Sequence, residues 1–164
     1  MRVLAIDPGF DRLGLAILEG DPSKPTLVWS VCVEPERGEP QERLAAVFAA
    51  VKDAIEMYAP DVLAVETLFF STNVKTAIGV AQARGAVLAA AGAAKLPINE
   101  QSPQAVKLAV TGYGNADKKA VMVMVSKLIS LPPRKRLDDE YDAIALGIAA
   151  LASRNSLIHT QKTM

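Results

Sequence analysis

The pattern of apolar and polar stretches predicts three strands near the beginning of the chain. Residues 3–6 form an apolar run that ends at Asp7-Pro8-Gly9, which is typical of a buried strand followed by a turn. Residues 13–18 and 26–33 also have the character of strands, and the Gly- and Pro-containing segment 20–25 between them favours a hairpin loop. The chain is therefore expected to begin with a strand, a turn and a hairpin.

A change from strand to helical periodicity follows. Apolar residues recur at helical spacing across 40–58, which predicts an amphipathic helix, and the apolar run 62–65 before Glu66 predicts a fourth strand. The Ala-rich segment 73–94 favours a long helix, and 96–99 a short fifth strand. The remaining expected elements are three helices near 103–111, 117–130 and 139–153, and a flexible tail over 154–164.

This order of elements predicts one α/β domain over residues 1–153. A hairpin that leads into a strand–helix–strand crossover gives a five-stranded mixed sheet with helices on both faces. The 164 residues, 51% of them hydrophobic, are enough for a single core. No uninterrupted apolar stretch reaches the roughly 18 residues of a membrane span. The one cysteine, Cys32, excludes an internal disulfide and fits a reducing compartment, so we expect a cytoplasmic protein.

The residue types exclude several kinds of catalytic site. His159, the only histidine, lies in a polar C-terminal segment, and a zinc site built on His and Cys needs more such ligands than this chain has. A Ser-His-Asp or Cys-His arrangement would have to recruit that same histidine. If the protein is an enzyme, its chemistry is therefore expected to rest on carboxylates.

Charge is distributed unevenly although the formal net charge is zero. Residues 1–66 contain 12 acidic and 6 basic side chains, whereas residues 67–137 contain 2 acidic and 10 basic ones. Residues 138–164 are again acidic, with 4 acidic and 2 basic side chains. A phosphate-binding surface beside a carboxylate metal site would produce this pattern, although ordinary solvated surface charge can produce it as well.

Two carboxylates stand where predicted strands end. Asp7 follows the first strand and Glu66 the fourth, and these strands are expected to be parallel neighbours whose carboxyl ends meet at one edge of the sheet. Two like charges placed side by side require a cation. Each residue also has a plain structural interpretation, since Asp-Pro-Gly is a turn signal and a glutamate at a strand end can simply be solvated.

The segment 138–142, Asp-Asp-Glu-Tyr-Asp, precedes an apolar helical run. Acidic residues suit a helix N-terminus, but four in five residues exceed what capping requires. Asp139 and Asp142 share one helix face. Set against Asp7 and Glu66, they would form a cluster that selects Mg²⁺, with Mn²⁺ as a substitute. Two such ions about 4 Å apart catalyse phosphodiester hydrolysis without a histidine.

Several short motifs, in this order and spacing, resemble the RuvC Holliday-junction resolvases of bacteria, which belong to the ribonuclease H-like superfamily. The resemblance covers roughly residues 2–153. The motifs are Ile6-Asp7-Pro8-Gly9, Val65-Glu66 with Phe69, Asn73, Gln82-Ala83-Arg84-Gly85, Gln104-Ala105-Val106-Lys107, Lys118 and Asp142-Ala143.

The resemblance implies roles for the carboxylates. It makes Asp7, Glu66, Asp139 and Asp142 the catalytic metal ligands of a ribonuclease H-like fold. The segment just before Asp139 is slightly longer than the family pattern, so the position of Asp139 can also be taken by one of its neighbours. These alternatives are Asp138 and Glu140.

The resemblance also implies DNA contacts. Lys107 and Lys118 fall where the family has lysines that contact the DNA backbone, and Phe69 falls where it has an aromatic residue that stacks on an unpaired base. Lys119 and the basic run 134–136 are plausible further phosphate contacts from charge alone, and solvated helix-end charge explains them equally well. The segment 67–68 differs from the family pattern, which leaves sequence preference open.

The implied activity is resolution of four-way DNA (Holliday) junctions in recombination and repair. A homodimer, with the small-residue helix 73–94 at its interface, would nick two like strands symmetrically and leave 5′-phosphate and 3′-hydroxyl ends. Cooperation with the RuvA–RuvB branch-migration complex is implied as well. Two alternatives stay open: a ribonuclease H-like nuclease that acts on RNA–DNA hybrids, and a junction-binding protein without activity.

Overall fold

The computed structural model describes residues 1–68 and 74–153. Its strands and helices follow the predicted order, with five strands and five helices in the described part of the chain. They are β1 (Arg2–Pro8), β2 (Leu13–Asp21), β3 (Lys24–Val33), α1 (Pro40–Tyr58), β4 (Val62–Glu66), α2 (Val74–Ala93), β5 (Ile98–Gln101), α3 (Pro103–Thr111), α4 (Lys118–Leu128) and α5 (Asp138–Ala152). The predicted tail, residues 154–164, lies outside the described residues.

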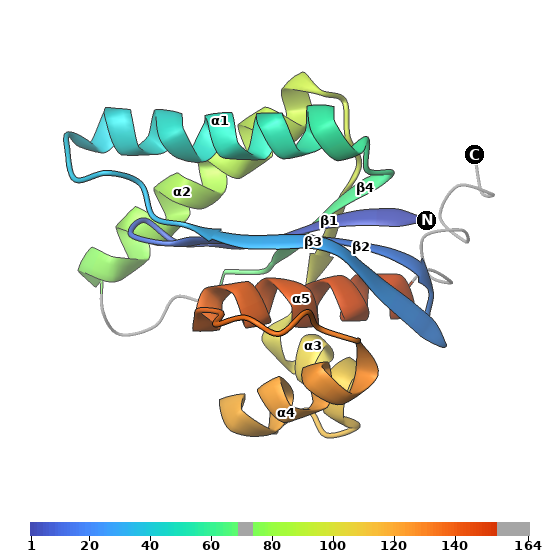
Figure 1. Ribbon diagram of the computed structural model, residues 1–164. Helices are drawn as coiled ribbons and strands as arrows, with labels where there is room; N and C mark the ends of the chain where they lie inside the picture. The colour runs from blue at the N-terminus through green and yellow to red at the C-terminus, as the bar shows by residue number, and fades with distance from the viewer. Residues whose placement is uncertain (69–73, 154–164) are drawn as a thin grey trace, which may run out of the picture.

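The five strands form one mixed sheet in the order β3-β2-β1-β4-β5. Strands β1, β2 and β3 are antiparallel neighbours, and β1–β4 and β4–β5 are parallel pairs. Helices α1 and α2 cover one face, and α5 lies on the other face with α3 and α4 on its far side (Figure 1). The expected five-stranded mixed sheet with helices on both faces is confirmed.

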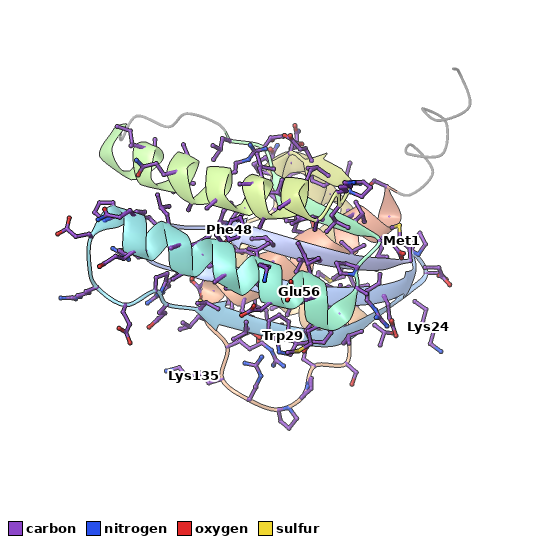
Figure 2. The ribbon with its side chains drawn as sticks, turned by 90° about the horizontal axis from the view of Figure 1, so that it is seen from above. Met1, Lys24, Trp29, Phe48, Glu56 and Lys135 are labelled. Carbon is purple, nitrogen blue, oxygen red and sulfur yellow. The ribbon has the colours of Figure 1, made fainter. Side chains whose placement is uncertain are left out.

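The sheet separates two apolar cores, as the alternation of side chains along each strand requires. On β1, Leu4 and Ile6 face the helices α1 and α2, whereas Val3 and Ala5 face α5. Figure 2, a view from above, shows α1 and α2 running side by side over the sheet. Trp29 of β3 stacks on Tyr58 of α1 with ring centroids 5.1 Å apart, which closes that core at the sheet edge.

Local signals explain where the helices begin. Helix α1 begins after Glu39, whose side chain and that of Glu42 form a reciprocal capping box. Ser102 and Asp117 accept hydrogen bonds from backbone amides of the first turns of α3 and α4. Strand β5 begins two residues later than expected, because the Leu96 amide still donates to the end of α2 through the Ala91 carbonyl.

Helix α5 lies unusually close to strand β2, and two glycines make this approach possible. A Cβ atom at Gly14 would collide with the Asp139 carbonyl oxygen, and a Cβ atom at Gly147 would collide with the side chain of Leu18. Since Gly14 is paired with Asp7 across β1 and β2, the first turn of α5 is brought to the end of β1. The packing of one helix thereby delivers an acidic segment to a strand-end carboxylate.

Candidate active site

An open cavity of about 310 Å³ lies at the carboxyl ends of β1 and β4. Its acidic lining residues are Asp7 of β1, Glu66 of β4 and Asp142 of α5, and its basic ones are Lys107 of α3 and Lys118 of α4. The acids come together because β1 and β4 are parallel, with Ile6 opposite Val65. The full lining is Asp7, Glu66, Pro103, Val106, Lys107, Lys118, Val121, Asp142 and Ala145.

Burial and mutual repulsion both raise the pKa values of the carboxylates in the cavity. The pKa of Asp7 is raised from 3.8 to about 7, first by burial and then by the charges of Asp142, Asp139 and Glu66, against a small opposing effect of Lys118. Burial and the charge of Asp142 also raise the pKa of Glu66, which the charge of Lys107 partly offsets. Ionising both carboxyl groups in the metal-free site is therefore unfavourable.

Lys118 is the nearest cation to the acids of α5. Its Nζ atom lies 2.9 Å from Oδ2 of Asp142, to which it donates a hydrogen bond, and 3.6 Å from Oδ2 of Asp138. Burial lowers the pKa of Lys118, but the hydrogen bond and charge of Asp142, together with Asp138, outweigh it and leave the pKa raised. Lys119, the next residue of α4, is exposed and does not line the cavity.

Asp139 stands beside the cavity and not in its wall. Its Oδ2 atom lies 3.7 Å from Nη1 of Arg12, whose Nε atom lies 3.3 Å from Oε1 of Glu34. Arg12 was not among the site residues predicted from the sequence. The available signal was its position in the turn between β1 and β2, a few residues after Asp7.

Glu140 points away from the cavity and is 2% exposed. It accepts a hydrogen bond from Ser30 Oγ at 2.5 Å and forms ion pairs with Arg134 and Arg136. Arg136, which is 3% exposed, lies 3.4 Å from it. The geometry therefore does not favour Glu140 as a substitute for Asp139, and it gives Arg134 and Arg136 structural partners inside the chain.

The donor set fits a hard cation. The acidic side chains of the cavity, Asp7, Glu66 and Asp142, offer carboxylate oxygens. Mg²⁺ and Mn²⁺ prefer oxygen ligands of this kind. Within residues 1–68 and 74–153, no group of three or more His, Cys, Asp or Glu side chains has an arrangement that could hold a metal ion without rearrangement. Asp142 is engaged by Lys118 and Asp139 by Arg12, so these side chains would have to turn to act as ligands.

Phe69, the predicted stacking residue, lies outside the described residues. None of the helices in the described ranges has the length and apolar content that crossing a bilayer requires.

Comparisons with known proteins agree on one family. A model of the family described as crossover junction endodeoxyribonuclease RuvC matches residues 3–150. The chain is 40% identical to the protein of that name from Moorella thermoacetica over 149 residues, which are 90% of this chain and 89% of the relative. It is 43% identical to that from Chloroflexus aggregans, covering 90% of this chain and 91% of the relative.

Solved structures give the same result. The structure of Thermus thermophilus RuvC in complex with a Holliday junction substrate matches with a TM-score of 0.85 and 32% identity, covering 91% of this chain and 92% of the other. The yeast mitochondrial Holliday junction resolvase Ydc2 matches with a TM-score of 0.71 at 14% identity, which shows a shared fold.

The mixed sheet with carboxylates at the ends of its central parallel strands defines a nuclease of the ribonuclease H-like class. The family match covers most of the described domain. The chain belongs to the RuvC family of crossover junction endodeoxyribonucleases. The expected fold and the expected class of DNA phosphodiester hydrolase are thereby confirmed.

Proposed function

We propose that the protein is a homodimeric endonuclease that resolves four-way DNA junctions by paired, symmetric nicks and depends on Mg²⁺, with Mn²⁺ as a substitute. The observation that carries this proposal is the cavity that gathers Asp7, Glu66 and Asp142 together with Lys107 and Lys118. Membership of the RuvC family supports the substrate, since a relative of the same fold is named in complex with a Holliday junction.

The proposed metal ligands are Asp7, Glu66, Asp139 and Asp142. Two bound ions would activate the attacking water and stabilise the leaving 3′ oxygen, which yields 5′-phosphate and 3′-hydroxyl ends. The raised pKa of Asp7 supports this assignment, because burial and the neighbouring carboxylates both disfavour its ionised form, and a bound cation would offset both effects. Asp139 would have to leave Arg12 to complete the set.

The chain's cations hold the DNA in this proposal. Lys107 and Lys118 line the same cavity as the strand-end acids, where they can contact the phosphates that flank the cleaved bond. Lys119, exposed on the same turn as Lys118, is proposed as a further backbone contact. Phe69 is proposed to stack on an unpaired base at the junction centre.

The dimer interface is proposed on helix α2. Ile78 is 55% exposed on it, and small residues there would let a second helix approach closely. A Cβ atom at Gly85 would meet nothing within 4 Å. A two-fold dimer would supply two active sites for two cuts.

We further propose that residues 1–153 form one nuclease domain, that the protein cooperates with the RuvA–RuvB complex, and that it acts in the cytoplasm.

The test is cleavage of a mobile synthetic four-way junction in Mg²⁺, in Mn²⁺ and with a chelator. Linear duplex and RNA–DNA hybrid of the same sequence serve as matched substrates. The proposal expects paired nicks that require metal, that ligase can seal, and that occur on the junction alone. Equal cutting of the hybrid would point to a general ribonuclease H-like nuclease, and binding without cutting would point to a structural junction binder.

A further inference from the structure

Asp139 differs from the other three proposed ligands in its place beside the cavity instead of in its lining. Asp7, Glu66 and Asp142 line the cavity, whereas Asp139 faces the guanidinium of Arg12. The three charges of Asp139, Arg12 and Glu34 form a row, with distances of 3.7 Å and 3.3 Å between neighbouring groups. Arg12 is thus shared between an acid of the site and an acid outside it.

The backbone at Asp139 has little freedom to move. Its carbonyl group packs on Gly14 of β2 so closely that even a methyl group there would not fit. The side chain is less restricted, because 27% of it is exposed and its ion pair with Arg12 is long. Rotation of the carboxylate is therefore the movement by which Asp139 can pass from Arg12 to the cavity.

We propose that Arg12 competes with the divalent cation for Asp139 and thereby sets the affinity of the metal site. This inference rests on the proposed metal ligands. While Asp139 pairs with Arg12, the cation has Asp7 and Glu66, and Asp142 once that side chain turns from Lys118. When Asp139 turns inward, Arg12 keeps Glu34 as its partner, so the guanidinium is not left without a counter-charge.

Arg12 lies between two acids, Asp139 and Glu34. Removing Arg12 and removing Glu34 should therefore change the metal affinity in opposite directions. Arg12→Gln removes the competitor and is expected to tighten metal binding. Glu34→Gln removes the second partner of Arg12, so the guanidinium pairs more fully with Asp139 and metal binding is expected to weaken. Because 49% of the Arg12 side chain is exposed, each change is expected to be about two- to fivefold and to shrink at high salt.

The experiment is a titration of the full-length protein with Mn²⁺ in the absence of DNA, followed by electron paramagnetic resonance of the free ion. Arg37→Gln is the matched control, because it removes an exposed arginine from the segment between β3 and α1. It is expected to leave the Mn²⁺ dissociation constant unchanged. Circular dichroism checks that each variant is folded.

A double-substitution cycle separates competition for Asp139 from the general field of a positive charge. In an Asp139→Asn background, Arg12→Gln is expected to lose its effect on Mn²⁺ binding. An equal effect in both backgrounds, or effects of the same sign for Arg12→Gln and Glu34→Gln, would overturn the inference while leaving the proposed function intact. A wild-type protein that binds no Mn²⁺ would overturn both.

Discussion

Replacing Asp7 by Asn is expected to stabilise the metal-free protein while it abolishes cleavage. The carboxylate of Asp7 lies among three other acids, and burial together with their charges raises its pKa from 3.8 to about 7. An ionised Asp7 is therefore unfavourable in the folded protein and not in the unfolded chain. Asn keeps the size of the side chain and removes the charge.

The magnitude follows from the pKa shift. One pKa unit corresponds to about 1.4 kcal/mol, so a shift of about three units sets an upper bound of roughly 4 kcal/mol. Solvent screening and side-chain rearrangement reduce this value, and we expect a gain of about 1–3 kcal/mol above pH 7. For a chain of this size the gain corresponds to an increase in Tm of about 2–12 °C.

The pH dependence has a definite sign. Below pH 3.8 Asp7 is protonated in both states and costs nothing, whereas between 3.8 and about 7 the unfolded chain releases a proton that the folded protein retains. The penalty therefore grows over this range and is constant above it. The stabilisation of Asp7→Asn relative to wild type is expected at pH 5 to be about 40% of its value at pH 8.

The assay is thermal unfolding in chelator at pH 5 to 9, with Asp53→Asn on the exposed face of α1 as the control for loss of an acid. Adding Mg²⁺ at pH 8 should raise the Tm of wild type more than that of Asp7→Asn, because the variant binds the ion less well. A Tm difference that is independent of pH, or a variant less stable than wild type at pH 8, would refute the reasoning.

Three other substitutions test separate parts of the site. Lys118→Ala is expected to slow junction cleavage and to flatten the salt dependence of junction binding, and an unchanged slope in binding titrations would remove it from the DNA contacts. Glu140→Gln leaves the buried charge of Arg136 without its partner and should cost about 3–5 kcal/mol in urea unfolding, whereas a loss below 1 kcal/mol would contradict a buried ion pair. Gly14→Ala should push the first turn of α5 away from β2 and reduce cleavage at least tenfold, while Ala at exposed Gly85 should not.

Local sequence patterns are enough to predict the order of strands and helices and the position of the two strand-end acids, Asp7 and Glu66. Apolar runs that stop at Asp7 and Glu66 predict two strand ends, and the connection between them predicts that these strands are parallel neighbours. Their position in the structure follows directly from that topology. Segment 138–142 could likewise be placed at a helix start from its acids and the apolar run after it.

The direction in which each acid of that segment faces could not be predicted from spacing alone. Glu140 turns away from the cavity because Ser30, 110 residues earlier, and two arginines just before α5 provide a buried site for it. Asp139 turns toward Arg12 because the turn after β1 brings that guanidinium to it. Both outcomes depend on contacts between distant segments, which a single sequence does not reveal.

Helices α3 and α4 lie on the far side of α5 from the sheet (Figure 1). The acids at the strand ends therefore belong to the central layer of the molecule, whereas Lys107 and Lys118 are carried by its outermost layer. This outer layer is nevertheless part of the same core, because the valines of α3 and α4 that face α5 are buried: Val106, Val110, Val121 and Val125. If Lys107 and Lys118 bind DNA as proposed, the DNA contacts and the acids lie on different layers of one core, so a change in the packing of α3 or α4 on α5 would alter the distance between the bound strand and the acids.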